Sequence, residues 1–303
     1  MSEVLVVGSL AFDSIKTPHG EVDEEPGGAA TYFSLGASLF ADVNLVGIIG
    51  DDFDQTLLGQ LQKRGVNLDG LEIREGEKTF RWKGRYETDL EAQTDQTDLN
   101  VFQEFEPRLP ESYRDTPYVF LANIDPELQL SVLDQINHPK IVACDTMNFW
   151  IERKPEILEN VLKQVDFFFL NDAEAQMMTD EPNLIHAANE LRERGPSVVV
   201  IKKGEHGVFM VGEDWRFVLP GFPVALVQDP TGAGDSFGGG FMGYLAKAQA
   251  NDFDTLKNAL VHANIVASFT VQEFGVRGLL NVEEWDLDER YQRFARLTHF
   301  NNG

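Results

Sequence analysis

Short, mostly apolar runs recur along the chain, separated by stretches in which apolar residues follow a helical spacing. The runs lie at residues 4–7, 43–49, 118–122, 141–144, 165–170, 197–201, 208–211 and 224–227. Apolar runs of this length are typical of strands buried on both faces, as in a parallel sheet. Helical spacing is clearest at 256–269 and 282–298. The alternation of the two patterns predicts an α/β fold.

Residues 73–108 break this rhythm. From Thr79 to Tyr86, aromatic and basic side chains alternate with a period of two. One face holds Phe80, Trp82 and Tyr86, and the other holds Arg81, Lys83 and Arg85. Such alternation is typical of a half-exposed sheet, whereas the polar segment 93–100 has the composition of a turn. We expect a small β-lid formed mainly by residues 73–108 and part of 12–24.

The composition limits the classes of partner. The 50 Asp and Glu residues outnumber the 25 Lys and Arg residues, which gives a net charge of −25. Such a surface repels nucleic acid and anionic membranes, so we expect neither as a partner. No apolar run approaches the roughly 18 residues of a membrane span, and the N-terminus lacks the basic start of a signal peptide. The single cysteine, Cys144, forms no intrachain disulfide, which fits a cytoplasmic protein.

The strongest chemical signal is the glycine-rich stretch 229–240, which follows the apolar run 224–227 and precedes a helical pattern. We expect a strand, a turn and the start of a helix. The first N–H groups of a helix lack intrahelical partners, and the helix dipole adds positive charge there. Because Gly232, Ala233 and Gly234 have little or no side chain, an anion can approach their backbone closely. Asp235, in the first turn, is placed to deprotonate a hydroxyl that attacks a phosphoryl group.

Other interpretations of this stretch compete. The glycines can simply permit close helix packing, and Asp235 can simply complement the helix dipole. Residues 234–238 also match G-x-S-x-G, the nucleophile elbow of hydrolases. That elbow needs a strand running directly into its first glycine, but residues 229–233 intervene. It also needs a later histidine, and only His262 and His299 remain. We therefore set the hydrolase interpretation aside.

Residues 229–235, Asp-Pro-Thr-Gly-Ala-Gly-Asp, resemble the D-T-x-G-A-G-D signature of ribokinase-like (PfkB) carbohydrate kinases, with Pro230 at the usual Thr position. Further stretches resemble family motifs in the same order: Gly-Gly at 27–28, Gly-Asp-Asp at 50–52, Asn-x-x-Glu at 171–174 and a glycine turn at 204–207. The resemblance spans residues 4 to about 278. It implies a ribokinase-like fold, a doubly wound, mostly parallel sheet with helices on both faces, as a single domain over residues 1–303.

Several residues are candidates for binding the phosphoryl acceptor. Asp13 lies just past the carboxyl end of the first strand, and the resemblance implies that it accepts hydrogen bonds from substrate hydroxyls. Asn123 and Asp125 follow the run 118–122, where a substrate can lie, although both are equally suited to capping the next helix.

A glycine pair adds to these candidates. The resemblance implies that Gly27 and Gly28 form a switch that carries lid motion. In ribokinases an Asn follows shortly after this pair, whereas Thr31 and Tyr32 stand here, which argues against ribose itself as the acceptor.

The nucleotide is expected at other motifs. Asn171 and Glu174, three residues apart, share one face of a helix start and can order waters around Mg²⁺ and the phosphates. The same spacing satisfies a capping box, so both interpretations stay open. The turn containing Lys203, Gly204 and Gly207 resembles the family's nucleotide turn, in which Lys202 or Lys203 can contact phosphate. By the same resemblance, the helix that carries His262 borders the adenine.

The resemblance implies ATP-dependent phosphorylation of a primary hydroxymethyl group on a sugar or sugar-like substrate. Asp235 is then the general base, the N–H groups of residues 232–235 form the anion hole, and Mg²⁺ bridges the phosphates. It also implies that K⁺ can bind near Asp229 and Thr231, and that lids of two subunits can pair in a homodimer. A nucleoside kinase is the alternative, because Phe12, Phe80 and Trp82 can stack on a base. A catalytically silent sugar or nucleotide sensor is the third.

Overall fold

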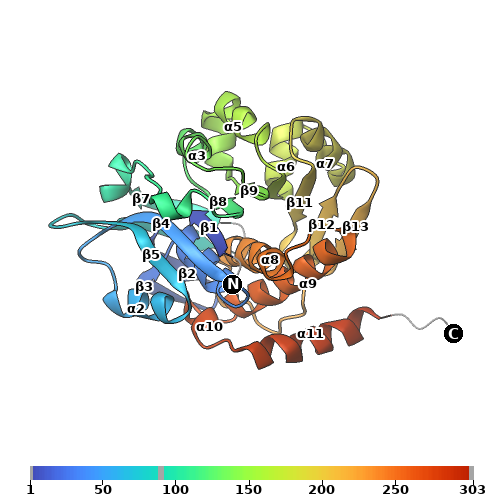
Figure 1. The fold of residues 1–303 in the computed structure, drawn as a ribbon. Coiled ribbons are helices and arrows are strands. Elements are labelled where there is room, and N and C mark those ends of the chain that lie inside the picture. Colours follow the sequence, from blue (N-terminus) through green and yellow to red (C-terminus); the bar gives the residue numbers. More distant parts are fainter. Residues whose placement is uncertain (1–2, 88–91, 300–303) are drawn as a thin grey trace.

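The computed structural model describes residues 3–87 and 92–299, which contain two sheets (Figure 1). In the main sheet, nine strands follow the order β13-β12-β11-β10-β9-β8-β1-β4-β5. They are β1 (Glu3–Val7), β4 (Asp42–Gly50), β5 (Val66–Arg74), β8 (Tyr118–Leu121), β9 (Ile141–Asp145), β10 (Phe167–Asn171), β11 (Val198–Lys202), β12 (Val208–Val211) and β13 (Arg216–Leu219). All pairs from β5 to β11 are parallel, and only β12 and β13 pair antiparallel. The mostly parallel sheet confirms the predicted fold class.

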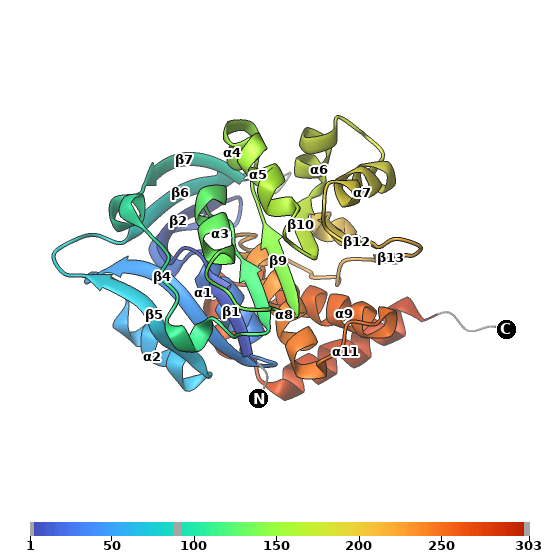
Figure 2. The same ribbon diagram turned by 45° about the horizontal axis from the view of Figure 1, so that its top comes forward.

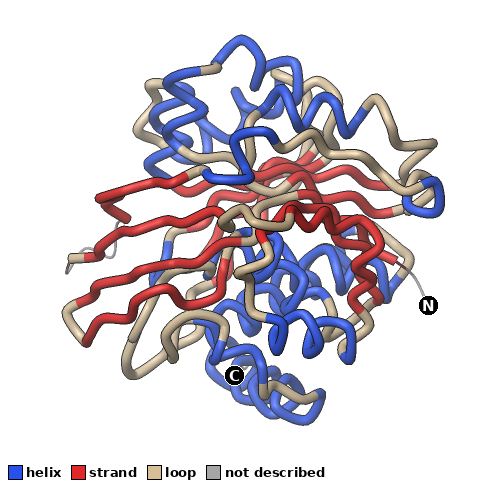
Figure 3. The backbone as a smooth tube through the Cα atoms, turned by 90° about the vertical axis from the view of Figure 1, so that its left-hand side faces the viewer, coloured by secondary structure: helices blue, strands red, loops and turns tan. Residues whose placement is uncertain are grey.

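Helices cover both faces of this sheet, which lies as a layer of strands between them (Figures 2 and 3). They are α1 (Ala29–Ala37), α2 (Gln55–Lys63), α3 (Pro126–Leu133), α4 (Asn148–Arg153), α5 (Pro155–Leu162), α6 (Asp172–Thr179), α7 (Leu184–Glu193), α8 (Ala233–Ala248), α9 (Phe253–Thr270), α10 (Arg277–Leu280) and α11 (Glu284–Thr298). Alternate residues of β1 point to opposite faces. Val4 and Val6 belong to the hydrophobic cluster shared with α1, α8 and α9, whereas Leu5 and Val7 belong to the cluster shared with α3, α5 and α7.

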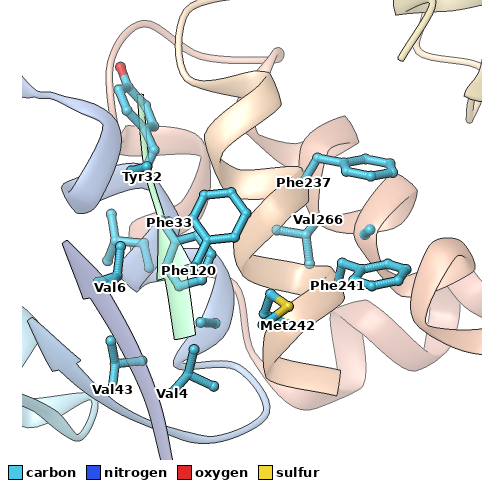
Figure 4. Packing of buried hydrophobic residues seen from close by; sticks show 14 of the residues in the cluster. Val4, Val6, Tyr32, Phe33, Val43, Phe120, Phe237, Phe241, Met242 and Val266 are labelled. Carbon is cyan, nitrogen blue, oxygen red and sulfur yellow. The ribbon is translucent and has the colours of Figure 1, made fainter. Parts of the chain in front are cut away.

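The first cluster fixes the position of α8 against α1 (Figure 4). Phe33 of α1 stacks on Phe120 of β8 at 4.4 Å between ring centroids, and Phe241 of α8 packs on Phe169 of β10 at 5.3 Å. Gly239 lets the helices approach closely, because a Cβ there would lie 2.2 Å from the carbonyl oxygen of Phe33. Close packing therefore explains this glycine, which lies beyond the anion-binding turn. The predicted helix 282–298 is confirmed as α11.

A second sheet lies beside the main one, with the order β3-β2-β6-β7. Its strands are β2 (Ala11–Thr17), β3 (Gly20–Gly27), β6 (Phe80–Tyr86) and β7 (Ala92–Asp98). We call this second sheet the lid sheet. Residues 73–74 belong instead to β5 of the main sheet, and residues 100–104 form a 3₁₀ turn. Part of the stretch expected as lid, residues 88–91, lies outside the described residues.

Two local predictions are wrong. Residues 224–227 form no strand: the segment is a loop held to α9, with Leu226 49% exposed and the N–H of Gln228 bonded to the carbonyl of Val271. Residues 93–100 form most of β7 rather than a turn, because an edge strand needs only one ladder, here with β6, and can expose polar side chains. Across the described residues, no helix is long and apolar enough to cross a membrane.

Candidate active site

The anion turn, residues 232–234, lies where α8 begins. Gly232 precedes the helix with φ 73°, and a Cβ there would lie 2.3 Å from the ring of Tyr32. Only glycine fits both the left-handed backbone and this close approach. As the N-cap residue, Gly232 supplies no side-chain cap, and the N–H of Ala233 donates to the carbonyl of Pro230 at 3.2 Å. The N–H groups of Gly234 and Asp235 are therefore the ones in the first turn of α8 that are arranged for an external anion.

Asp235 lies in the first turn of α8, beside the anion turn. Burial raises the pKa of its carboxyl to about 7, and the nearby Asp145 carboxylate adds to this rise while the Lys202 ammonium opposes it. A carboxylate whose pKa lies near neutrality is a stronger base than an exposed one, yet it is still largely ionised slightly above pH 7. The position and the pKa both suit proton abstraction from an attacking hydroxyl.

An ion pair between the buried Asp145 and the partly buried Lys202 lies against the anion turn. Lys202 Nζ is 3.2 Å from Asp145 Oδ2, and a Cβ on Gly234 would lie 2.8 Å from the same nitrogen. Burial lowers the pKa of Lys202, but the carboxylates of Asp145, Glu174 and Asp235 raise it more, so the group stays charged. These residues end the two strands on either side of β10: Asp145 is the last residue of β9 and Lys202 the last of β11.

The sequence motifs do not single out Asp145, and they name Lys202 only as an alternative to Lys203. The Nζ of Lys203 lies 4.7 Å from the ring centre of Phe209. Gly204 begins the 3₁₀ turn Gly204–His206, and Gly207 closes it by accepting from the N–H of Lys203 at 2.8 Å. The signal that points to both Asp145 and Lys202 is a charge at the carboxyl end of a buried strand, the edge at which open α/β sheets bind ligands.

Asp13 brings a second carboxylate to the site. It lies on β2, is 4% exposed and accepts a hydrogen bond from the N–H of Gly28 at 3.3 Å. A Cβ on Gly27 would lie 2.0 Å from Asp13 Oδ2, so only glycine permits this contact. Burial raises the pKa of Asp13 to about 7, and the charges of Asp229 and Asp235 contribute. Asp13, the glycine pair and the anion turn therefore surround one site.

Asp229 organises the loop that leads into α8. Its two carboxylate oxygens accept from the N–H groups of Thr231 and Gly275, both at 2.9 Å. The hydroxyl of Thr231 donates to the hydroxyl of Tyr86 at 3.0 Å, which joins β6 of the lid sheet directly to the loop before the anion turn. Any displacement of β6 would therefore act on the residues that hold the turn.

Four other predicted residues have structural partners. Asn171 and Glu174 form a complete capping box at the start of α6, with both hydrogen bonds 2.7 Å long. Asn123 accepts from the indole N–H of Trp150 at 3.1 Å. Asp125 caps α3 and forms an ion pair with Lys154. The capping geometry left open by the sequence is thus present for Asn171, Glu174 and Asp125. Their roles toward a ligand stay predictions.

The structure does not bring His262 to the anion turn. Its ring stacks between those of Tyr244 and Tyr291, at 4.6 and 5.2 Å. Tyr244 lies on α8 about 13 Å along the axis from Asp235. Burial lowers the pKa of His262 to about 4. On the same helix, Asn264 instead holds the loop after β13, accepting from the N–H of Phe222 and donating to the carbonyl of Pro220.

Known proteins resemble this chain over most of its length. Residues 1–282 match the model of the pfkB family of carbohydrate kinases. A cytidine kinase of Thermococcus kodakarensis is 31% identical over 249 residues, covering 80% of this chain and 88% of that protein. Ribokinase of Bacillus subtilis is 25% identical, covering 92% of this chain and 96% of that protein.

Solved structures share the fold. The nucleoside kinase of Methanocaldococcus jannaschii, an archaeal member of the ribokinase family, superposes with a TM-score of 0.78 at 22% identity, covering 97% of this chain and 99% of that one. A putative ribokinase II of E. coli gives a TM-score of 0.80 at 19% identity, with coverage of 97% and 100%. Kinases of this family use ATP as co-substrate, generally with a divalent metal. The chain belongs to the pfkB family of carbohydrate kinases.

Proposed function

We propose that this kinase transfers the γ-phosphoryl group of ATP to the primary hydroxymethyl group of a ribosyl compound, either a sugar or a nucleoside. The observation that carries the proposal is the placement of Asp235, partly buried beside the anion turn with a pKa of about 7. The relatives named cytidine kinase, nucleoside kinase and ribokinase share a ribosyl acceptor. Asp13, an acceptor-only carboxylate, suits the vicinal hydroxyls of such a ring.

The reaction follows from these positions. Asp235 takes the proton of the hydroxymethyl group as its oxygen bonds to the γ-phosphorus, and the bond from that phosphorus to the β–γ bridging oxygen breaks to release ADP. The N–H groups of residues 232–235 stabilise the charge on the transferred group. Lys202, held by Asp145, adds a fixed positive charge at the same place. The low polarity of the buried site strengthens each of these interactions.

The nucleotide is assigned to the carboxyl ends of β10 and β11. Asn171, Glu174, Lys203, Gly204 and Gly207 lie at or just after these strand ends. Among residues 3–87 and 92–299, no group of three or more His, Cys, Asp or Glu side chains is arranged to hold a metal. Mg²⁺ commonly binds through waters, one or two carboxylates and the nucleotide phosphates, and the carboxylate of Glu174 is suited to such a role. Bound there, Mg²⁺ would neutralise phosphate charge.

A monovalent cation is proposed near Asp229 and Thr231. Asp229 is 1% exposed, and each carboxylate oxygen accepts one backbone N–H, which leaves lone pairs for a cation such as K⁺. Its contribution would be to neutralise the buried carboxylate, whose pKa is raised by burial. Pro230 lies between the two residues and donates no hydrogen bond.

For the nucleoside alternative, the three rings proposed to stack on a base also have contacts within the protein. Phe80 stacks on Phe102 at 5.4 Å, and Phe12 lies between Phe53 and the guanidinium of Arg81. Trp82 packs near Tyr86 and donates from its indole N–H to Thr94. A homodimer through the lid sheet is also proposed, and sedimentation of the full chain tests it.

A single screen tests the proposed function. Release of ADP is measured with ATP, Mg²⁺ and each of ribose, cytidine, inosine and fructose, for the wild type and for Asp235→Asn. We expect turnover with at least one ribosyl compound, a phosphorylated hydroxymethyl group in the product and almost no turnover in the variant. Binding of these compounds without turnover would favour a silent sensor and contradict the proposal. The relative kcat/KM values for ribose and for the two nucleosides decide between a sugar kinase and a nucleoside kinase.

A further inference from the structure

Tyr32 occupies a central place between the acceptor residues and the anion turn. It lies in the first turn of α1 and is 1% exposed. A Cβ on Gly232 would lie 2.3 Å from its ring, and a Cβ on Gly27 would lie 3.3 Å from its Cε2. That added Cβ on Gly27 would also lie 2.0 Å from Asp13 Oδ2. The ring therefore lies between the anion turn and the glycine that contacts Asp13.

The hydroxyl of Tyr32 has no hydrogen-bond partner among the described residues, although it is fully buried. Its oxygen points away from Phe33, Phe120 and the rest of the hydrophobic cluster (Figure 4). Burying a hydroxyl without a partner is unfavourable, and phenylalanine would fill the same volume without that loss. Packing therefore accounts for the ring of Tyr32 but not for its hydroxyl.

The charges around this hydroxyl indicate what it can bind. Burial raises the pKa of Tyr32, and the charges of Asp13, Asp229 and Asp235 raise it further, as does Tyr86. The group therefore remains a neutral hydrogen-bond donor in a site whose carboxylates are acceptors. The hydroxyl of Tyr86 already has a partner, because it accepts from Thr231, whereas the structure gives no partner of either kind for the hydroxyl of Tyr32. A ligand that supplies an acceptor atom beside Asp13 would satisfy it.

We propose that Tyr32 determines acceptor specificity: its hydroxyl donates to a ring hydroxyl of the substrate, and the same ring hydroxyl donates to Asp13. This inference rests on the proposed function. A hydroxyl is the small neutral group that donates and accepts at once, so the pair selects a substrate with a secondary hydroxyl at this point. Deoxy analogues that lack this hydroxyl are rejected because Tyr32 and Asp13 both lose their partner.

The test compares Tyr32→Phe with the wild type, using the best ribosyl acceptor from the screen and its 2-deoxy and 3-deoxy analogues (2′ and 3′ in a nucleoside). In the wild type, one deoxy analogue should lose at least tenfold in kcat/KM. In Tyr32→Phe, the KM for the parent acceptor should rise about tenfold. The loss of kcat/KM between the parent acceptor and that deoxy analogue should be smaller than in the wild type by a similar factor. The KM for ATP should not change.

A matched control separates recognition from structure. Tyr113 is also buried, but its hydroxyl donates to the carbonyl of Asn67 at 3.0 Å. Tyr113→Phe should lower the midpoint of thermal unfolding and leave both KM values unchanged, whereas Tyr32→Phe should leave the midpoint equal or raise it.

Two results would overturn the inference. One is an unchanged acceptor KM in Tyr32→Phe. The other is a drop in thermal midpoint comparable to that of the control. Absence of wild-type turnover with every acceptor would instead contradict the proposed function, and the inference with it.

Discussion

The ammonium of Lys202 lies 3.2 Å from Oδ2 of Asp145, against the backbone of Gly234 where α8 begins. Two charges of opposite sign thus lie near Asp235 and act on its pKa in opposite directions. Their contact links β9, β11 and α8 at the edge of the sheet where the phosphoryl group is proposed to transfer. The arrangement makes the ionisation of Asp235 open to a direct test.

Burial raises the pKa of Asp235 to about 7, Asp145 raises it and Lys202 lowers it. Because the base acts when deprotonated, kcat/KM should fall as the pH drops through this pKa. Asp145→Asn removes the charge that raises the pKa, so its acid limb should move to lower pH. Lys202→Met removes the charge that lowers the pKa, so its acid limb should move to higher pH. An acid limb at the same pH in the wild type and in both variants would show that Asp145 and Lys202 do not act on the pKa of the base.

Asp13→Ala should raise the KM for the acceptor much more than the KM for ATP. A hydrogen bond to a charged group contributes about 1.5–3 kcal/mol, which corresponds to a rise of roughly 10- to 150-fold. Steady-state kinetics with each substrate varied in turn measures the two effects. Asp252→Ala is the control, because Asp252 caps α9 and should lower stability without a change in either KM. Equal rises in both KM values would make Asp13 a structural residue.

Gly232→Ala should impair both folding and turnover. The left-handed backbone at φ 73° is strained for alanine by about 1–3 kcal/mol, and the added methyl would meet the ring of Tyr32. Gly59→Ala is the matched control, since Gly59 lies inside α2 with nothing within 4 Å of the added Cβ. That variant should gain about 0.5–1 kcal/mol of unfolding free energy. Chemical denaturation measures both changes, and equal stability of the two variants would contradict the argument.

Much of the fold can be predicted from the sequence because buried strands and helices leave a regular pattern of apolar residues. The run 4–7 predicts β1, since every residue in it contacts a hydrophobic cluster on one face or the other. The run 224–227 has the same composition, yet it lies outside the sheet. What separates the two is the long-range pairing of the backbone: β1 has neighbours on both sides, whereas this loop is held by Asn264 and Val271 of the α9 region. Local pattern does not encode such pairing.

The candidate site likewise contains residues that the sequence predicts and residues that it does not. The turn 232–234 and Asp235 are recognisable because their spacing is local. Asp145 and Lys202 are 57 residues apart in sequence and meet only because β9 and β11 both lie beside β10. Which of Lys202 and Lys203 lies beside the anion turn depends on which side chain points toward α8, and the sequence motif does not determine that direction. The hydrogen bond proposed from Tyr32 to a hydroxyl of the substrate likewise rests on the burial of Tyr32, which the sequence does not show.

The lid sheet provides a test of motion. Tyr86 ties β6 to Thr231 in the structure, and its ring packs with Ile15 and Phe274. We predict that acceptor binding closes the lid sheet further, pivoting near Gly27 and Gly28, and that closure excludes water from the site. Hydrogen exchange in β6 and β7 should slow when the acceptor is added. Trp82→Ala should raise the acceptor KM and the rate of ATP hydrolysis without transfer. Equal exchange with and without acceptor would indicate a static sheet.

The central claim is that Asp235 is the general base, and Asp235→Asn tests it most directly. The variant keeps the shape of the side chain, and its thermal midpoint at pH 8 should equal or exceed that of the wild type, because a partly desolvated carboxylate is replaced by a neutral amide. ATP binding, measured by calorimetry, should survive. The single-turnover rate of phosphoryl transfer should fall about 10²–10⁴-fold. A folded, ATP-binding variant that transfers phosphate at the wild-type rate would contradict the account.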